Sequence, residues 1–357
     1  MSVTVTTSAV STAVTAGGQT SCATHNDGTL WCWGRNNFGQ LGDGTTAPRP
    51  TPAPVGTFVD WKQVSASGST TCGVRADSTL WCWGLNNFGQ LGVAGASRSI
   101  PVQVGTNATW TSVSTSWFHT CATRSNGTLW CWGANRHGEL GLGGINRGYV
   151  LPHKVGPGVV TWASVTSGGF HTCATRTDGT AWCWGQNIFG QLGNANPAIQ
   201  PNPVQVGLLT DCKQLSASWA HTCGLSTVGQ LRCWGFNSSG QVGDGTLTTQ
   251  LAPVPVASDR TWTSISTAES STCAIDAAGG AWCWGANHYG QLGNGQTTTS
   301  LVPSPVPSDL PWVSLTAGWW HGCGVRQGGE AVCWGNNEWG QLGDATLVDA
   351  PLPKEVL

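Results

Sequence analysis

The sequence predicts an all-β protein, a single seven-bladed β-propeller built from four-stranded antiparallel blades. Three observations predict it: a sequence repeat, four short strand-like segments in each copy, and a composition rich in Gly and Trp. The glycine of the tripeptide C-W-G recurs at Gly34, Gly84, Gly133, Gly185, Gly235, Gly285 and Gly335. The intervals are 50, 49, 52, 50, 50 and 50 residues. Copies of about 40 to 50 residues with four strands each are typical of propeller blades.

The copy at residues 61–109 shows the order of the elements within a blade. The first three strands are expected in WKQVSASG, TTCGVR and STLWCWG, which are too short for helices and rich in Val, Thr and Trp. The glycine-rich stretch LNNFGQLG predicts a loop, and the Pro-bounded IPVQV predicts the fourth strand. Because apolar residues do not simply alternate in L-W-C-W, we expect both faces of each sheet to pack against neighbouring blades.

The seven copies fill one domain, residues 1–357, and each is expected to form one blade. They cover residues 11–60, 61–109, 110–161, 162–211, 212–261, 262–311 and 312–357. Residues 351–356 match the outer strand of the last blade, and residues 3–5 fall at the same place by their distance from Val55. Residues 1–10 are therefore either a closing strand or a surplus N-terminal arm. Such an arm would add a strand beside the last blade or dock onto a neighbouring molecule and support oligomers.

The charge pattern restricts the class of partner. Only 9% of the residues are charged, the net charge is -2, and there is no run of Lys and Arg. We therefore expect no nucleic-acid partner and no anionic membrane partner. No apolar run reaches the roughly 20 residues of a membrane span, so no membrane insertion is expected. The N-terminus lacks the basic and apolar regions of a signal peptide, so an exported chain would have lost its signal or would use another route.

Fourteen of the 15 cysteines stand in pairs ten residues apart. The pairs are Cys22 and Cys32, Cys72 and Cys82, Cys121 and Cys131, Cys173 and Cys183, Cys223 and Cys233, Cys273 and Cys283, and Cys323 and Cys333. In the fourth copy, residues 177–179 suit a three-residue hairpin closed by Arg176 and Thr180. Counting outward places Cys173 opposite Cys183. If the closing pair is hydrogen-bonded, the cysteines form a non-hydrogen-bonded pair with Cα atoms about 4.5 Å apart, which a disulfide can bridge.

Two other interpretations of these cysteines compete with disulfides. A structural zinc site expects about two to four residues between paired ligands, not nine. Reduced, buried cysteine is the other alternative. Seven disulfides would persist only in an oxidising compartment, so we expect an extracellular or secreted protein. Cys212 is the unpaired cysteine and stands where most other copies have Trp, which favours a small apolar side chain in a Trp position over an intermolecular disulfide.

No constellation with catalytic chemistry stands apart from the repeat. Four copies carry a histidine two residues before the first cysteine, at His119, His171, His221 and His321. Because the blade rotation keeps these imidazoles apart, we favour structural histidines over a metal site. No carboxylate pair and no Ser/His/Asp or Cys/His arrangement is evident. We therefore expect a protein that is not an enzyme, without catalytic residues, a metal site or a cofactor.

The repeat resembles that of the regulator of chromosome condensation (RCC1) family. Its fullest copy, residues 168–193, carries the pattern G-x-x-H-T-C-A…D-G-T-x-W-C-W-G-x-N-x-F-G-Q-L-G, and the resemblance covers all seven copies. It implies a seven-bladed propeller but no single function, because functions in the family are diverse. An extracellular bacterial β-lactamase inhibitor with a similar propeller binds through aromatics at the turn between strands one and two. The nuclear exchange factor relies on acidic residues, of which this face offers little beyond Glu139, Glu269 and Glu338.

Positions that vary between copies while their neighbours stay fixed are the better candidates for function. One set lies in the turn between strands one and two and another in the loop between strands three and four, which share a face in an up-and-down blade. The candidate partner-binding residues are Trp117, Phe118, Phe170, Trp219, Trp319, Trp320, Arg35, Arg136, Phe236, His288 and Glu338. Aromatic rings with scattered polar groups suit a protein-binding hot spot or a sugar-stacking platform. The alternative is that these rings pack between blades.

The sequence thus predicts a secreted, non-enzymatic interaction scaffold that binds a protein partner through an aromatic-rich propeller face. A lectin-like, glycan-binding propeller and a self-assembling filament subunit are the alternative functions. Nucleotide exchange on a small GTPase is disfavoured, because the expected binding face carries few acidic residues.

Overall fold

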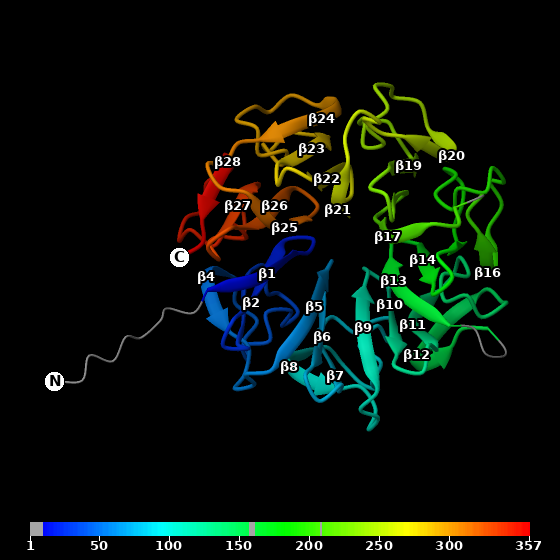
Figure 1. Ribbon diagram of the computed structural model, residues 1–357. Coiled ribbons are helices and arrows are strands. Elements are labelled where there is room, and N and C mark those ends of the chain that lie inside the picture. The colour runs from blue at the N-terminus through cyan, green and yellow to red at the C-terminus, as the bar shows by residue number, and fades with distance from the viewer. Residues whose placement is uncertain (1–9, 157–160, 208) are drawn as a thin grey trace.

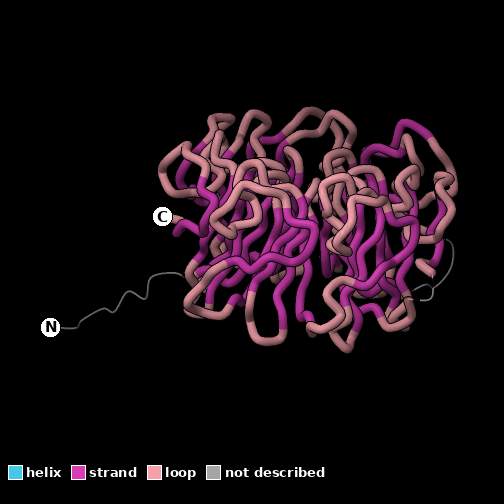
Figure 2. The backbone as a smooth tube through the Cα atoms, turned by 90° about the horizontal axis from the view of Figure 1, so that it is seen from above, coloured by secondary structure: helices cyan, strands magenta, loops and turns pink. Residues whose placement is uncertain are grey.

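The computed structural model describes residues 10–156, 161–207 and 209–357 and confirms the predicted seven-bladed β-propeller (Figure 1). Seven four-stranded antiparallel sheets surround a central axis, and the loops gather on the two faces of the disc (Figure 2). The described residues contain strands but no helix. They accordingly include no helix that is long and apolar enough to cross a membrane.

Each blade consists of four consecutive strands, ordered from the central axis outward. The innermost strands are β1 (Ser11–Ala16), β5 (Trp61–Ser67), β9 (Trp110–Thr115), β13 (Trp162–Ser167), β17 (Cys212–Ala217), β21 (Trp262–Thr267) and β25 (Trp312–Ala317). The second strands are β2 (Thr20–His25), β6 (Thr70–Arg75), β10 (His119–Arg124), β14 (His171–Arg176), β18 (His221–Ser226), β22 (Ser271–Asp276) and β26 (His321–Arg326). The third strands are β3 (Leu30–Gly34), β7 (Leu80–Gly84), β11 (Leu129–Asn135), β15 (Ala181–Gly185), β19 (Leu231–Gly235), β23 (Ala281–Gly285) and β27 (Ala331–Gly335). The outer strands are β4 (Arg49–Pro54), β8 (Arg98–Gln103), β12 (Asn146–Lys154), β16 (Gln200–Gln205), β20 (Gln250–Pro255), β24 (Ser300–Val306) and β28 (Ala350–Glu355).

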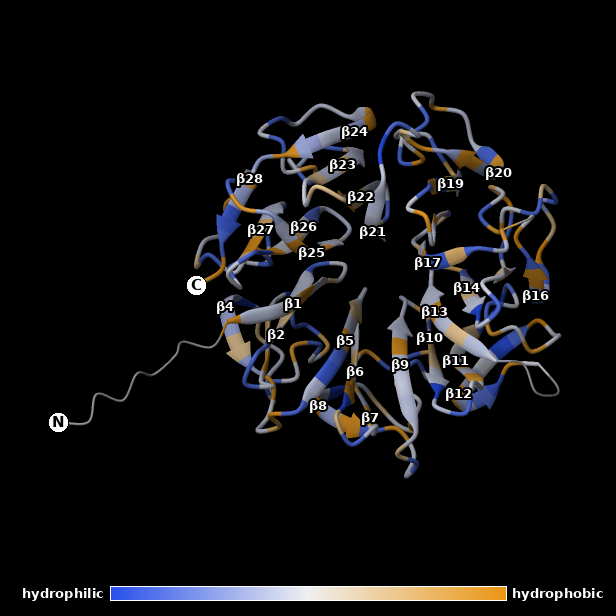
Figure 3. Cartoon of the chain, in the orientation of Figure 1, coloured by the Kyte–Doolittle hydropathy of each residue, from blue (hydrophilic) through white to orange (hydrophobic). Residues whose placement is uncertain are grey.

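The composition of the outer strands explains their position at the rim. Strand β4 reads RPTPAP and β24 reads SLVPSPV. Proline has no backbone N–H to donate to a ladder, so it is tolerated at sheet edges and protects them from pairing with another chain. The second and third strands, by contrast, are almost wholly buried between neighbouring blades. Hydrophobic and hydrophilic residues are interspersed along the blades rather than segregated on one face (Figure 3).

The hairpin between the second and third strands has the predicted register. Gly179 adopts a left-handed backbone with φ of 82°, and the N–H of Arg176 donates to the carbonyl of Thr180 at 3.0 Å. Cys173 then lies directly opposite Cys183, and the two are joined by a disulfide with Cα atoms 4.1 Å apart. The other six pairs form the same cross-strand bridge. In the chain-entropy model each such bridge is worth about 3 kcal/mol.

The hydrophobic core lies between blades rather than inside any one of them. In one cluster the Cys121–Cys131 disulfide and Leu140 of blade 3 pack against Trp162 and Trp184 of blade 4. The disulfides therefore fill space beneath the indoles of the next blade. The tryptophans of the C-W-G tripeptides are fully buried in all seven blades.

One hydrogen bond recurs at all seven seams between blades. The indole Nε1 of each C-W-G tryptophan donates to a backbone carbonyl of the preceding blade. The acceptor is the second residue of the G-Q-L-G loop, as in the bond from Trp83 to Gln40 at 2.9 Å. The second glycine of that loop makes room for the indole. A Cβ on Gly42 would lie 2.7 Å from Nε1 of Trp83, which is closer than real Cβ contacts allow.

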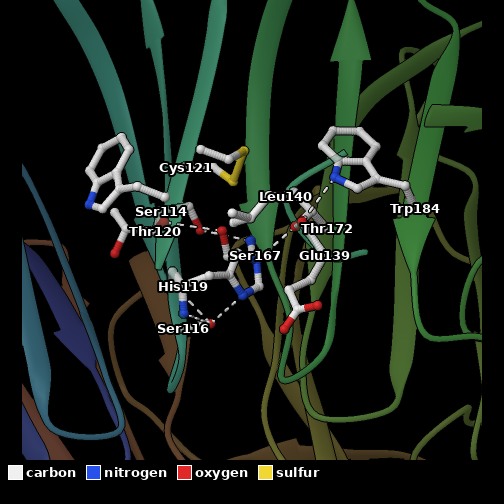
Figure 4. The surroundings of a disulfide bond; sticks show 12 residues. Ser114, Ser116, His119, Thr120, Cys121, Glu139, Leu140, Ser167, Thr172 and Trp184 are labelled. Atoms are coloured by element: carbon white, nitrogen blue, oxygen red, sulfur yellow. Dashed lines mark hydrogen bonds between the residues drawn. A yellow bond between two sulfur atoms is a disulfide. The ribbon is translucent and has the colours of Figure 1, made fainter. Parts of the chain in front are cut away.

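The four structural histidines also bridge neighbouring blades. Thr172 donates its hydroxyl to the carbonyl of Glu139, so Nε2 of His119 must donate to Thr172, at 2.7 Å (Figure 4). Equivalent bonds run from His171 to Thr222, from His221 to Thr272, and from His321 to Ser21. Each imidazole is buried, and burial lowers its pKa to about 3. The histidines are therefore neutral donors within the core.

Among the described strands, the first blade and the last blade are each built from four consecutive strands of their own. Strand β28 pairs with β27, as predicted for residues 351–356, and β1 lies against β25 and β26 of the last blade. The backbone N–H of Ser11 donates to the carbonyl of Gly329 at 3.0 Å, and Trp33 donates to the carbonyl of Gln341 at 2.9 Å. Residues 1–9 lie outside the described residues, so a docking role for the N-terminal arm stays a prediction.

The cysteine arrangement predicts the outcome of alkylation without reductant. We expect intact-mass analysis of the oxidised protein to show modification of at most one thiol, that of Cys212. Its reaction should be slow, because burial raises the pKa of this thiol to about 12. Modification of many thiols in protein prepared under oxidising conditions would contradict both the disulfides and the oxidising compartment.

The buried histidines predict a loss of stability in acid. Their pKa is about 3 in the folded protein and about 6.5 when unfolded, so their contribution is complete above about pH 6.5 and is lost as the pH falls toward 3. Blades 1 and 2 have Thr at the place of His171, so His171→Thr is a suitable replacement. The free energy of unfolding should fall between about pH 6 and pH 4, and this fall should be roughly 2 kcal/mol smaller in His171→Thr than in the wild-type protein. Urea unfolding at the two pH values measures it. An unchanged difference in His171→Thr would contradict the assignment.

Candidate binding face at the mouth of the central channel

The turn between strands one and two and the loop between strands three and four are tied together in every blade. The first residue after each C-W-G tripeptide donates its N–H to the carbonyl of the last turn residue, as from Ala134 to Phe118 at 2.8 Å. The loop itself is held by its asparagine. Asn36, for example, accepts from the N–H of Leu41 and donates its amide to the carbonyls of Thr45 and Ala47. Both variable sets predicted from the sequence therefore lie on one face.

The innermost position of this face is a tryptophan in three blades, a glycine in three blades and Glu269 in blade 6. In blades 3, 5 and 7 it holds Trp117, Trp219 and Trp319, and in blades 1, 2 and 4 it holds Gly18, Gly68 and Gly169. Each indole lies over the glycine of an adjoining blade. A Cβ on Gly68 would be 3.1 Å from the ring of Trp117, and one on Gly169 would be 2.9 Å from the ring of Trp219. The glycines thus let the rings fold inward toward the axis.

Six predicted aromatic residues meet in one cluster at this end of the channel. Trp117 of blade 3 stacks on Trp319 of blade 7 with ring centroids 3.9 Å apart and planes 7° apart. Trp219 contacts Trp117 at 6.3 Å and Phe170 at 5.0 Å. Phe118 and Trp320 extend the contacts outward from Phe170 and Trp319. All six side chains are partly exposed.

Sequence reasoning missed two members of the cluster. Phe88 contacts Phe118 at 5.3 Å, and Tyr289 contacts Trp320 at 5.6 Å. Both occupy the loop position just before G-Q-L-G, which was read as part of the fixed repeat. That position in fact varies, because it holds Phe, His, Ser, Tyr or Trp in different copies. We call these eight residues the channel-mouth cluster: Phe88, Trp117, Phe118, Phe170, Trp219, Tyr289, Trp319 and Trp320.

The remaining candidates lie on the same face but outside the channel-mouth cluster. Arg35 donates to Gln19 at 2.7 Å and its guanidinium lies 5.0 Å from the ring centre of Trp339. Phe236 contacts Phe189 at 4.7 Å. The other three, Arg136, His288 and Glu338, are exposed. Among the described residues no ring contact or side-chain hydrogen bond joins those three to the cluster.

The channel beneath the cluster is narrow and polar. A cavity of about 170 Å³ is lined by serine and threonine residues of the innermost strands, together with Trp117, Trp219 and Trp319. Several of these hydroxyls accept hydrogen bonds from backbone N–H groups on the innermost strand of the neighbouring blade. Ser114, for example, accepts from the N–H of Ser167 at 2.9 Å (Figure 4). Glu269 also lines the cavity, and burial raises the pKa of its carboxyl. The tryptophans therefore cover one end of a hydroxyl-lined channel.

Glu139, expected among the few acidic groups of this face, is buried instead. It replaces glutamine in the loop G-E-L-G, is only 1% exposed, and its carboxylate accepts from the N–H of His137 at 2.6 Å. Burial raises its pKa. The expectation was wrong because this loop position serves the backbone: Gln40 and Gln90 accept the equivalent bonds from Phe38 and Phe88.

Within the described residues, no group of three or more His, Cys, Asp or Glu side chains is placed to hold a metal ion. The four buried histidines are each engaged with the next blade and do not converge. What the face offers is apolar, partly exposed aromatic surface with peripheral charges. Its arrangement suits recognition of another molecule's surface.

Comparisons with known proteins support the resemblance seen in the sequence. The model of the RCC1-like domain matches residues 2–266, and models of the regulator of chromosome condensation (RCC1) repeat match residues 278–325 and 312–341. The ultraviolet-B receptor UVR8 of Arabidopsis thaliana is 40% identical over 74 residues. That match spans 20% of this chain and 17% of the receptor.

Solved structures show the same fold at low identity. Human WBSCR16 has a TM-score of 0.83 at 20% identity, with 92% of this chain and 94% of that chain covered. Yeast RCC1 (Prp20), in its structure with Kap60, has a TM-score of 0.82 at 20% identity, with 98% and 85% covered. Prp20p from Saccharomyces cerevisiae has a TM-score of 0.81 at 21% identity, with 98% and 87% covered.

The stacked pair predicts coupled stabilities. We expect Trp117→Ala and Trp319→Ala to destabilise the protein non-additively, with a coupling of about 0.5 to 1.5 kcal/mol, because either change removes the same stack. Urea unfolding of both single variants and the double variant measures it. Trp117→Ala combined with Phe236→Ala is the control pair and should be additive. Additivity of the Trp117 and Trp319 changes would contradict the stack.

Proposed function

The chain belongs to the RCC1-like domain family, and on that premise we propose that it is a non-enzymatic scaffold that binds a protein partner through the channel-mouth cluster. The observation that carries this proposal is the collection of eight partly exposed aromatic residues at one end of the channel. Binding hot spots are enriched in tryptophan and tyrosine and lie near the centre of an interface. Rings that already contact one another lose little conformational freedom when a partner covers them.

Relatives with the same fold support a protein partner. Yeast RCC1 is seen bound to Kap60, and Prp20p has binding properties to Gsp1p and histones. At about one fifth identity these likenesses concern the fold, so the proposal takes from them the class of partner and not its identity.

The charge of the face argues against nucleotide exchange on a small GTPase. Of the three acidic residues expected there, Glu139 is buried and Glu269 is half-buried beside the channel with a raised pKa. Glu338 alone is exposed. A face of this composition suits a partner with an apolar patch, because hydrophobic burial rather than charge would supply the affinity.

The seven disulfides indicate an oxidising environment, and we place the proposed function outside the cytoplasm, on a secreted protein. Glycan binding is the second candidate, because partly exposed indoles also stack on sugar rings. The binding experiment distinguishes the two functions, since millimolar free sugar would compete only with a glycan ligand.

The proposal predicts the effect of removing the central rings. The triple variant with Trp117, Trp219 and Trp319 each replaced by Ala should lose several kcal/mol of affinity for a partner recovered by pull-down from the native extracellular milieu. Calorimetric titration with the purified partner measures the loss. Val228→Ala, an exposed change in the tight turn of blade 5 on the opposite face, is the control and should keep full affinity. Intact affinity with a comparable loss of thermal stability would show that the rings serve packing alone.

A further inference from the structure

The face opposite the channel-mouth cluster carries a second set of tryptophans. In five blades the first residue of the innermost strand is a tryptophan. These residues are Trp61, Trp110, Trp162, Trp262 and Trp312. Each is buried against the C-W-G tryptophan of its own blade, with ring centroids between 5.6 and 6.1 Å apart. They lie at the end of the blade that carries the tight turns, because each innermost strand starts there.

An arginine and a second indole complete this arrangement in blades 3 and 4. The guanidinium of Arg124 lies 4.3 Å from the ring centre of Trp110 and 4.2 Å from that of Trp130. Arg176 lies 5.1 Å from Trp162 and 3.6 Å from Trp182. We call this place the indole slot. It is made by the first residue of strand one, the last residue of strand two and the second residue of strand three.

Blade 5 departs from the pattern at all three positions of the indole slot. Cys212 stands for the first tryptophan, Ser226 for the arginine and Arg232 for the second indole. Among the described residues, Leu215 and Trp234 come nearest to the place that the ring of Trp61 occupies in blade 2, and they fill it only in part. A Cβ on Gly73 of blade 2 would lie 2.5 Å from the ring of Trp61, whereas one on the equivalent Gly224 would meet its nearest atom, in Leu215, at 3.3 Å.

The result is a cavity of about 360 Å³ in blade 5. Its walls include Leu209, Cys212, Gly224, Leu225, Ser226 and Arg232. This volume falls at the lower end of the roughly 300 to 1,000 Å³ of small-molecule pockets. Cys212 is predicted as a small apolar residue in a Trp position, and the structure shows that it occupies this position without filling it.

The chemistry of the walls has an apolar and a cationic part. Leu209, Leu225 and the Cys212 thiol surround the place of the ring, and burial raises the pKa of that thiol to about 12, so it stays uncharged. Arg232 is half-buried, and its side chain has no hydrogen bond, ion pair or ring contact with any residue that the structure describes. Asp211 also borders the cavity, but it is exposed and its charge is screened by solvent.

We propose that the indole slot of blade 5 binds a small planar aromatic acid, with its ring in place of the missing tryptophan and its carboxylate on Arg232. The ring would bury apolar surface that five other blades bury with their own indole. Guanidinium groups pair with carboxylates and lie against aromatic faces, as Arg124 and Arg176 do here. The site is separate from the channel-mouth cluster, so it stands or falls independently of the proposed function.

Blade 1 provides an internal contrast. It also lacks the first tryptophan, having Ser11 there, and a cavity of about 500 Å³ lies beside it. That cavity is bordered by the carboxylates Glu330 and Glu355 and has no arginine in its lining. It therefore offers no guanidinium to pair with a carboxylate, so a single site per chain is expected.

Calorimetric titration of the oxidised full chain with indole-3-acetate tests the proposal. We expect saturable binding of one molecule per chain. Cys212→Trp restores the residue that five blades carry and should weaken binding at least about tenfold while leaving the unfolding temperature unchanged or higher. Absence of binding to the wild-type chain, or binding that survives in folded Cys212→Trp, would overturn the site.

Arg232→Gln tests the recognition of the acid. It should weaken indole-3-acetate about tenfold and change the binding of neutral indole by less than about twofold. Lys213→Gln is the matched control, because Lys213 carries an exposed charge next to Cys212 but does not line the cavity. It should change the affinity for neither indole-3-acetate nor indole. Equal effects of Arg232→Gln on both ligands would overturn the role of the guanidinium.

A measurement on the unaltered protein covers the case in which Cys212→Trp fails to fold. Indole-3-acetate at saturating concentration should slow the alkylation of Cys212 by iodoacetamide at least about fivefold, because the bound ring would cover the thiol. An unchanged alkylation rate would overturn the proposal.

Discussion

The hydrogen bond from each C-W-G indole to the backbone carbonyl of the preceding blade is the interaction on which the rest of the propeller depends. It fixes the distance and the rotation between neighbouring sheets at all seven seams. It also explains two fixed features of the repeat. The loop must present that carbonyl at a set place, and its second glycine must leave room for the indole, as Gly42 does for Trp83. Because the same carbonyl also accepts a threonine or serine hydroxyl at six of the seams, the bond is embedded in the buried network that holds the histidines.

The fold and the cysteine register could be predicted because they follow from local geometry. A three-residue turn with a left-handed glycine sets which residues face each other, so Cys173 and Cys183 are paired by counting alone. The contacts within the channel-mouth cluster could not be predicted in the same way. The stack of Trp117 on Trp319 joins blades three steps apart around the ring, and it depends on side-chain directions over glycines that no single copy reveals. Glu139 was misplaced because its loop position was judged by its charge rather than by the glutamines that share it.

The two unusual sites of this propeller arise from departures of single copies from a common frame. The channel-mouth cluster exists because some blades place tryptophan where others place glycine. The cavity of blade 5 exists because three positions change together, at Cys212, Ser226 and Arg232. In a repeat protein each blade needs only to satisfy its neighbours, so one copy can change while the others keep the ring stable. Aromatic residues consequently occupy two kinds of place in this protein. Some are buried at every seam between blades, and others are partly exposed at one end of the channel.

The construction of every blade from four consecutive strands has a consequence for the connectivity of the chain. The seam between β25–β28 and β1–β4 has the same indole-to-carbonyl bond as the six seams that a covalent linker crosses, and the same histidine bond as three of them. The chain could therefore start at any blade, and each blade would still have the same two neighbours in the ring. Joining the present ends and opening the chain at another linker would yield circular permutants with the same seven interfaces. The ring thus consists of seven similar interfaces between blades, and the chain does not run directly across one of them.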